Sequence, residues 1–227
     1  MVKIAVNGAA GRMGSRILEL ARETSGVTAA GAFDQSRFPR VSAGALKACD
    51  VLIDFSSPEG TAESLAACLE AGRALVVGTT GLDDAMAGRL RAAAAKIPLV
   101  QSSNMSIGVN VVLRLLEVAA KQLGNDFKLE LTETHHVHKK DAPSGTAKMM
   151  AEVIKKQTGQ YPPIQSIREG EIVGDHTARF EGAAESVEIT HHAKSRDVFA
   201  KGAIEAARFL STARPGRLYS MADVLGL

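Results

Sequence analysis

In VKIAVNGAAGRMG, residues 2–14, an apolar run passes through a glycine-rich turn into a helical pattern. Gly8, Gly11 and Gly14 have the spacing GxxGxxG, a variant of the dinucleotide-binding fingerprint. This chemistry requires glycines because backbone N–H groups must come close to a pyrophosphate at the N-terminus of a helix. The stretch therefore predicts a strand–loop–helix unit that binds a dinucleotide, with a plain strand–helix turn as the alternative.

An acidic residue stands where such a unit would use one. Asp34 ends the second apolar run, 20 residues after Gly14, and a carboxylate at this place binds the ribose hydroxyls of the adenosine. GTTG (78–81) and SSNMS (102–106) follow two later apolar runs, at the carboxyl ends of predicted strands, where open α/β sheets bind ligands. We therefore expect a nicotinamide dinucleotide as the cofactor.

Short apolar runs alternate with helical patterns through the first half of the chain. This alternation predicts βαβ units and a parallel sheet. Residues 34–50 are poorly periodic and predict a loop or one weak helix. The expected strands are 2–6, 27–33, 51–55, 74–78 and 97–101, and the expected helices are 12–22, 60–71 and 82–95.

The pattern changes after about residue 106. Residues 108–123 have the spacing of an amphipathic helix, whereas 127–134 and 185–192 alternate apolar and polar side chains as half-buried strands do. A second domain with an antiparallel-looking sheet is therefore expected at roughly 107–196, followed by a helix at 197–212. The fold class predicted is α/β: a Rossmann-like parallel-sheet domain plus an α+β domain with a mixed or antiparallel sheet.

Composition excludes several classes of partner. The 27 basic and 25 acidic residues give a net charge of only +2, which offers no general surface for nucleic acid or membranes. Two cysteines, Cys49 and Cys68, are too few for a disulfide framework or a zinc site. No signal-peptide pattern and no apolar span of 18 residues is present, so we expect a cytoplasmic protein.

The second distinctive segment is THHVHKKDAPSGTAK, residues 134–148. It lies at the end of a predicted strand and enters a helix, for which Pro143 suits the entrance and Ser144 the cap. The N–H groups of Gly145 and Thr146 would then point outward, where the helix dipole favours a carboxylate. The segment predicts a site for an anion at the start of this helix.

The histidines and lysines of the same segment add charge and proton-transfer chemistry. His136 and Lys139 can bind a second carboxylate, so a dianionic substrate is expected, and one histidine near neutral pKa can donate a proton as a reduced product forms. A solvated loop is the alternative. A metal site built from His135, His136 and His138 is disfavoured because Lys139 and its neighbour Lys140 repel cations, so no metal is expected.

Six stretches in this order along the chain resemble the 4-hydroxy-tetrahydrodipicolinate reductase (dihydrodipicolinate reductase) family of lysine biosynthesis: VNGAAGRMG, VGTTG, SSNMSIGVN, HHVHKKDAPSGTA, GDHTARF and LYSMADVLGL. The resemblance implies reduction of a cyclic dicarboxylate, 4-hydroxy-tetrahydrodipicolinate, by NADH or NADPH to give tetrahydrodipicolinate in the diaminopimelate pathway. It also implies that 197–227 returns to the first domain (1–106). The second domain (107–196) would bind substrate and assemble a homotetramer through its sheet.

The resemblance also assigns roles by position. His135 matches the proton donor and acceptor of the family, and Lys139 matches a second proton donor. His136, Gly145 and Thr146 match residues that bind the substrate carboxylates. The matching cofactor-binding residues are Gly8, Ala9, Ala10, Gly11, Arg12 and Met13 at the pyrophosphate, Asp34 at the ribose, and Gly78, Thr79, Thr80, Ser102, Ser103, Asn104 and Met105 near the nicotinamide.

The chain departs from the family pattern at two places. Gln35 stands where some members have an arginine that holds a 2′-phosphate, so NADH and NADPH both stay candidate cofactors, and residues 34–50 are shorter than in many members. Two other functions are alternatives: a related oxidoreductase acting on another anionic imine, and a sensor that binds the dinucleotide without turnover. The intact HHVHK segment argues against the sensor.

Overall fold

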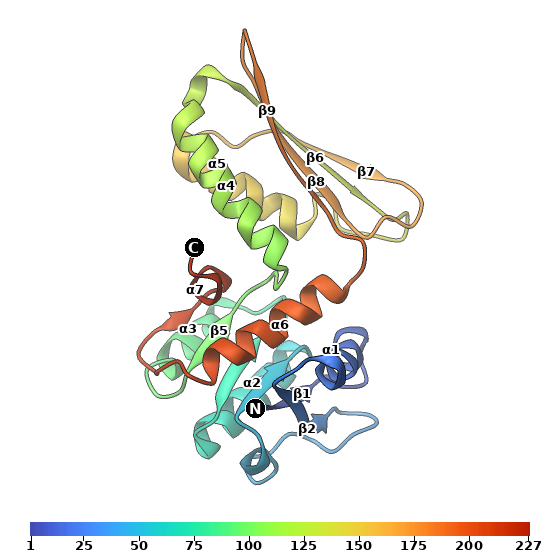
Figure 1. The fold of residues 1–227 in the computed structure, drawn as a ribbon, viewed down its shortest axis with the longest axis vertical. Coiled ribbons are helices and arrows are strands. Elements are labelled where there is room, and N and C mark those ends of the chain that lie inside the picture. Colours follow the sequence, from blue (N-terminus) through green and yellow to red (C-terminus); the bar gives the residue numbers. More distant parts are fainter. The chain divides into compact units, whose positions relative to one another are not determined.

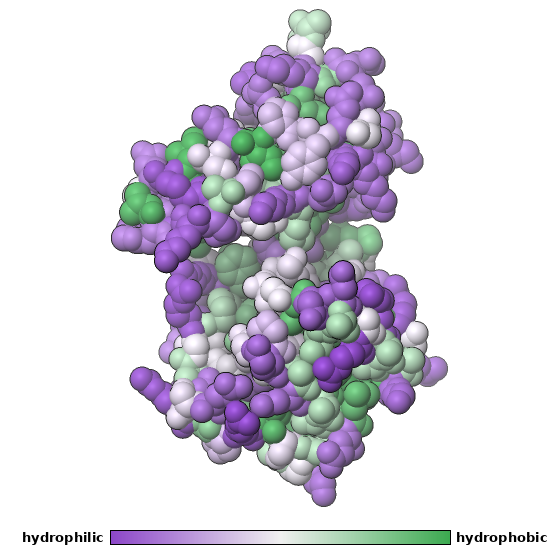
Figure 2. Space-filling model, turned by 180° about the vertical axis from the view of Figure 1, so that it is seen from behind, coloured by the Kyte–Doolittle hydropathy of each residue, from purple (hydrophilic) through white to green (hydrophobic).

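The computed structural model describes all 227 residues and divides into two compact units (Figure 1). One comprises Met1–Ile107 with Asp197–Leu227, here called the first unit, and the other comprises Gly108–Arg196, the second unit. None of the helices combines the length and the apolarity that a membrane crossing requires. Hydrophilic side chains make up most of the surface on the face shown in Figure 2, with hydrophobic ones scattered among them.

The first unit is built on a six-stranded parallel sheet in the order β10-β5-β4-β3-β1-β2. All five strands expected from apolar runs are present, whereas β10 was not expected, because two residues carry no readable pattern. The chain first runs from β1 outward to β2 and then returns to the other side of β1, so the order reverses between β1 and β3. The strands are β1 Val2–Asn7, β2 Val27–Phe33, β3 Val51–Asp54, β4 Ala74–Val77, β5 Leu99–Gln101 and β10 Leu218–Tyr219.

Helices cover both faces of this sheet because successive residues of each strand point to opposite sides. Ile4 and Val6 lie in one hydrophobic cluster with residues of α1 and α6, while Ala5 lies in another with residues of α2 and α3. The helices are α1 Arg12–Glu23, α2 Pro58–Ala71, α3 Asp84–Ala93, α6 Asp197–Leu210 and α7 Met221–Leu225, and a short 3₁₀ turn, η1, spans Ala45–Ala48.

The second unit is a four-stranded mixed sheet, in the order β7-β6-β8-β9, with two helices on one face (Figure 1). β6 and β7 are parallel and joined through α5, whereas β8 and β9 are antiparallel to their neighbours. The helix at 108–123 and the strands at 127–134 and 185–192 were expected, but β7 and β8 were not. The elements are α4 Ile107–Leu123, η2 Gly124–Asp126, β6 Lys128–His135, α5 Gly145–Thr158, β7 Ile164–Arg168, β8 Asp175–Glu181 and β9 Ser186–His192.

Candidate active site

The glycine loop of the first unit is closely packed against its surroundings. Gly8 has φ +82°, and a Cβ at this position would lie 2.2 Å from the carbonyl oxygen of Phe55. A Cβ on Gly14 would lie 2.1 Å from the carbonyl oxygen of Gly8. These approaches explain why the turn between β1 and α1 needs glycines, and they bring the loop backbone to the start of α1, where Gly11 is an N-cap without a side-chain cap.

A pocket of about 230 Å³ opens beside this loop. It lies at the carboxyl ends of β1 and β3, the place where the strand order reverses and where open α/β sheets bind ligands. Asp34 lines the pocket, and hydrogen bonds from the side chain and backbone N–H of Ser36 hold its pKa below the usual value of a carboxyl. The lining residues are Asn7, Gly8, Gly11, Asp34, Gln35, Phe55, Ser56, Ser57 and Gly60.

A buried carboxylate beneath the pocket was missed in the sequence. Asp54 is fully buried at the end of β3, and its oxygens accept hydrogen bonds from Asn7 Nδ2 (3.2 Å), Thr61 Oγ1 (2.5 Å) and Thr79 Oγ1 (3.0 Å). Burial raises the pKa of Asp54, and the hydroxyl hydrogen bonds oppose that rise. Because Asn7 Oδ1 accepts from the N–H of Gly8, Asp54 joins the glycine loop, α2 and the loop after β4.

The expected nicotinamide-side residues follow β4 and β5 as predicted by position. Thr79 and Asn104 are buried, and the side chain of Asn104 accepts from the N–H of Ser106 (2.9 Å). Met105 lies in the hydrophobic cluster of the first unit, where a Cβ on Gly202 would collide with its carbonyl oxygen. The side chain of Met105 is therefore part of the core of this unit.

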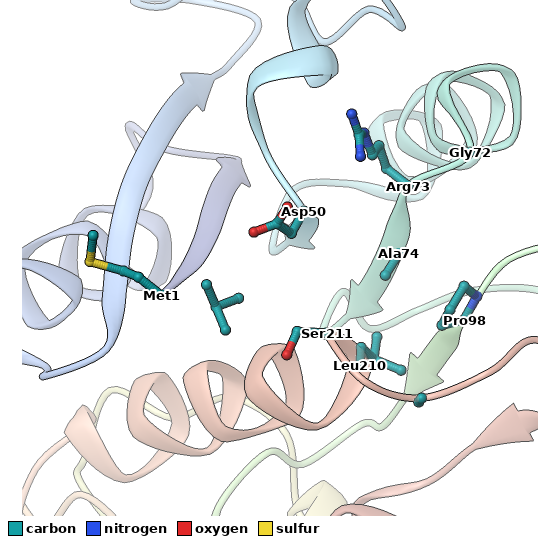
Figure 3. Close-up of a pocket in the computed structure, with 10 residues that line it drawn as sticks. Met1, Asp50, Gly72, Arg73, Ala74, Pro98, Leu210 and Ser211 are labelled. Carbon is teal, nitrogen blue, oxygen red and sulfur yellow. The ribbon is translucent and has the colours of Figure 1, made fainter.

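A larger pocket, about 460 Å³, lies at the opposite ends of the strands of the same sheet (Figure 3). Asp50, Arg73 and Pro98 line it, and each precedes a strand, β3, β4 and β5 respectively. The amino ends of the strands therefore border this pocket. Its size does not make it the dinucleotide site, because the glycine loop and Asp34 lie at the carboxyl ends.

The second unit places His135 on the buried face of β6. The alternation of this strand turns Leu131, Glu133 and His135 inward, toward α4 and α5. Burial lowers the pKa of His135, the contact of its Nδ1 with the Glu133 carboxylate opposes this, and the charges of Lys139 and Arg168 lower it further.

Glu133 is fully buried yet ionised, and sequence reasoning missed it. Arg168 Nη1 and Nη2 donate to its two oxygens at 3.0 and 2.9 Å, and the N–H of Ser144 donates at 3.2 Å. Burial raises the pKa of this carboxyl, but the hydrogen bonds from Arg168, Ser166 and His135 outweigh it, so the pKa stays below its usual value. A charged residue at an inward position of an alternating strand was the signal that could have identified it.

The loop between β6 and α5 contains His136 and Lys139 and leads into the start of α5. The backbone N–H of Lys139 donates to the carbonyl oxygen of His136 (3.1 Å), and Lys139 Nζ donates to Asp141 Oδ1 (2.8 Å). His136 Nδ1 is a buried nitrogen without a hydrogen-bond partner. Ser144 caps α5 as predicted, its Oγ accepting from the N–H of Ala147 (3.2 Å).

Two histidines from the neighbouring strands complete this cluster. His176 Nε2 lies 3.0 Å from Ser144 Oγ, and its ring stands edge-on to His135 with centroids 5.1 Å apart. Burial and the charge of His135 lower the pKa of His176 to about 4, so it is neutral at pH 7. His191 pairs with His176 in the register of β8 and β9, and burial lowers its pKa too. No group of three His, Cys, Asp or Glu side chains is arranged to hold a metal ion.

The two groups of expected site residues thus lie in different units. Those assigned to the cofactor are all in the first unit, and His135, His136, Lys139, Gly145 and Thr146 are all in the second.

The chain matches known proteins over its full length. Residues 2–105 match the family model of the dihydrodipicolinate reductase N-terminus, and residues 108–225 match that of the C-terminus. The 4-hydroxy-tetrahydrodipicolinate reductases of Anaeromyxobacter dehalogenans (strain 2CP-1) and Burkholderia pseudomallei (strain 668) are 41% and 43% identical. The alignments cover all of this chain and 98% and 100% of those proteins.

Solved structures show the same fold. A dipicolinate-bound dihydrodipicolinate reductase from Paenisporosarcina sp. TG-14 superposes with a TM-score of 0.86 at 21% identity, covering 98% of each chain. A probable dehydrogenase from Thermotoga maritima gives a TM-score of 0.62 at 11% identity, with 98% of this chain and 92% of that chain covered. The two family-model matches and the relatives above 40% identity decide the assignment: this chain belongs to the dihydrodipicolinate reductase family.

Proposed function

We propose that this protein is a 4-hydroxy-tetrahydrodipicolinate reductase, which uses NADH or NADPH to form tetrahydrodipicolinate for lysine biosynthesis. The proposal rests on residues 133–146: this one segment contains a buried histidine held by the Glu133 carboxylate, a lysine and a capped helix start. Family membership supports the same reading.

The first unit is proposed as the dinucleotide-binding domain. The glycine cradle, which a Cβ would fill, and the pocket beside it suit the pyrophosphate, and ionised Asp34 suits the ribose hydroxyls. The loops 78–80 and 102–105, which follow β4 and β5, would border the nicotinamide. A bound reduced nicotinamide supplies the hydride for C4 of the dehydrated substrate ring. Gln35, next to Asp34, is uncharged and offers no cation for a 2′-phosphate, so NADH and NADPH both stay candidate cofactors.

The second unit is proposed as the substrate-binding domain. One carboxylate of the substrate would bind at the start of α5, where Gly145 and Thr146 are the first two helical residues and the helix dipole favours negative charge. His136 and Lys139 would bind the other carboxylate. His136 Nδ1, buried and without a partner, is a group that such a ligand could satisfy.

Proton transfer is assigned to His135 and Lys139. His135 protonates the ring carbon next to C4, so that one hydride and one proton together reduce one double bond. Lys139 serves as a second proton donor, for which its ammonium must exchange the Asp141 carboxylate for the substrate.

The test is a coupled assay that generates the substrate from pyruvate and aspartate semialdehyde and follows the absorbance of NADH or NADPH. His135→Gln and Lys139→Ala should lower kcat by roughly 10²–10⁴-fold, the usual contribution of a general acid. His138→Gln is the matched control, because His138 lies in the same segment with a side chain 74% exposed and should stay active. No oxidation by folded wild-type protein that still binds the dinucleotide would reject the reductase and favour the sensor.

A homotetramer assembled through the sheet of the second unit is part of the proposal, as is a cytoplasmic location. The sheet face opposite α4 and α5 carries charged residues of both signs, Lys128, Glu130, Arg179 and Glu181, which also line a pocket of about 220 Å³. Light scattering should give about four times the chain mass of 23.9 kDa. A mass of one chain would reject the assembly.

A further inference from the structure

We propose that Glu133 and Arg168 form one positioning unit for both proton donors of the second unit: Glu133 fixes the tautomer of His135, and Arg168 holds the loop of Lys139 on the same carboxylate. The inference rests on the proposed function in assigning proton transfer to His135 and Lys139. Glu133 is fully buried, and together the two residues hold His135 and the loop of Lys139, so we assign them a positioning role.

The contact with Glu133 determines which nitrogen of His135 reacts. An ionised carboxylate only accepts hydrogen bonds, so the imidazole nitrogen beside Glu133, Nδ1, must carry a hydrogen. The other nitrogen, Nε2, is then the one that gains and loses a proton. A neutral His135 therefore exists as the Nδ1–H tautomer, and its protonated form donates from Nε2.

Gly174 lies close to Nε2 of His135. A Cβ on Gly174 would lie 2.9 Å from His135 Nε2, closer than real contacts of this kind come. Gly174 has no left-handed backbone angle that would explain the glycine otherwise. The missing side chain leaves room beside the nitrogen that Glu133 selects.

The guanidinium of Arg168 has hydrogen-bond partners on both sides. Two of its nitrogens hold Glu133, while Nη2 also donates to the carbonyl oxygen of Asp141 (2.6 Å) and Nε to that of Lys139 (3.3 Å). The loop with Lys139 is therefore tied to the carboxylate that holds His135. Arg168 stands opposite His135 in the register of β6 and β7, which fixes the geometry through the sheet.

The charges around His135 determine the sign of the pH effect. Glu133 on its own strand raises the pKa of His135, whereas Lys139, Arg168 from β7 and burial lower it. On β8, His176 is neutral at pH 7 and Asp175 is its neighbour, and on β9 His191 lies beyond His176. Removing the charge of Glu133 leaves the cations unopposed, so the pKa of His135 must fall.

The test combines spectroscopy and kinetics on the full chain. Long-range ¹H–¹⁵N correlation spectra of protein labelled at its six histidines report each tautomer, and the signals of His135 are those lost in His135→Gln. Above its pKa, His135 of the wild type should be the Nδ1–H tautomer. An Nε2–H tautomer would overturn the inference whatever the activity. If the Nδ1–H tautomer is present but the enzyme is inactive, the proposed function fails and the positioning of His135 stands.

Glu133→Gln should lower the pKa of His135 and move the alkaline limb of kcat to lower pH by the same amount. At pH 8 kcat should fall roughly 10–100-fold, because less of the acid is protonated and its ring is held less firmly, with KM for the dinucleotide unchanged. Glu152→Gln, the same change at an exposed position of α5, should alter neither quantity. An unshifted pH limb in folded Glu133→Gln would overturn the positioning role.

Arg168→Lys separates the two halves of the proposal and replaces Glu133→Gln should that variant not fold. Lysine keeps the charge beside Glu133 but cannot make the forked contact and reach the loop carbonyls at once. The tautomer of His135 should persist while kcat falls roughly tenfold through the loosened Lys139 loop. Unchanged kcat would overturn the role of Arg168.

Discussion

The buried His176 predicts a specific loss of stability in mild acid. Its ring is 4% exposed, packed between His135 and His191 with Nε2 beside Ser144. Its pKa falls from 6.5 to about 4 in the folded protein. In the unfolded chain His176 binds a proton with a pKa near 6.5, whereas in the folded chain it binds one only near pH 4. The contribution of neutral His176 to stability is therefore fully present above pH 6.5 and is lost as the pH falls toward 4.

The magnitude follows from the two pKa values. A lowering of about 2.5 pKa units corresponds to about 3 kcal/mol in total, of which about 2 kcal/mol is lost between pH 7 and pH 5. Because the pKa values of His135 and His191 are also lowered, the free energy of unfolding of the whole protein should fall by more than this. The share of His176 is isolated by substitution with glutamine, which does not titrate.

The measurement is urea unfolding of wild type and His176→Gln at pH 7 and pH 5. The difference in unfolding free energy between the two pH values should be smaller in the variant by about 2 kcal/mol. His138→Gln, at an exposed position, should behave as the wild type. Equal pH dependence in His176→Gln and wild type would refute the claim that the folded state excludes this proton.

Three further substitutions test the packing of the two sites. Asp54→Ala should lower the free energy of unfolding by about 2–4 kcal/mol and weaken dinucleotide binding, because it leaves the buried hydroxyls of its neighbours unpaired. Urea unfolding and fluorescence titration measure the two effects, and Asp50→Ala, at an exposed acid before the same strand, is the control. Gly14→Ala should abolish dinucleotide binding, since the new Cβ collides with the backbone of the glycine loop. Gly88→Ala in α3 is the control and should bind the dinucleotide normally. Tight dinucleotide binding by both variants would contradict the close packing of the loop. Ser144→Ala should lower stability by about 1 kcal/mol through loss of the α5 cap, a loss that calorimetry would detect.

The sequence predicted the first unit well because its strands are mostly apolar runs that alternate with helical patterns. β3 (VLID) and β4 (ALVV) are buried at every position, as expected for a parallel sheet covered on both faces. Asp54 could not be identified from these runs, because its role depends on hydroxyls from residues 61 and 79, which no local sequence pattern links to it.

The second unit was predicted less completely, for a physical reason. β7 (IQSIR) has only two apolar residues, and β8 places His176 at an inward position where a periodic pattern expects an apolar side chain. His135 and Lys139 could be proposed together with the Ser144 cap because all three lie within ten residues of the chain. The sequence did not reveal the pairing of Glu133 with Arg168, since that contact joins residues 35 apart through the sheet register.

We expect this protein to reduce the cyclic dicarboxylate with a hydride from the nicotinamide and a proton from its own histidine. The most direct measurement is the isotope content of the product, formed in the coupled assay with nicotinamide deuterated at its transferable C4 position. One deuterium is expected at ring C4, and the amount of labelled product should fall with the activity in His135→Gln. A product without deuterium from the cofactor, or no product from folded protein, would contradict this expectation.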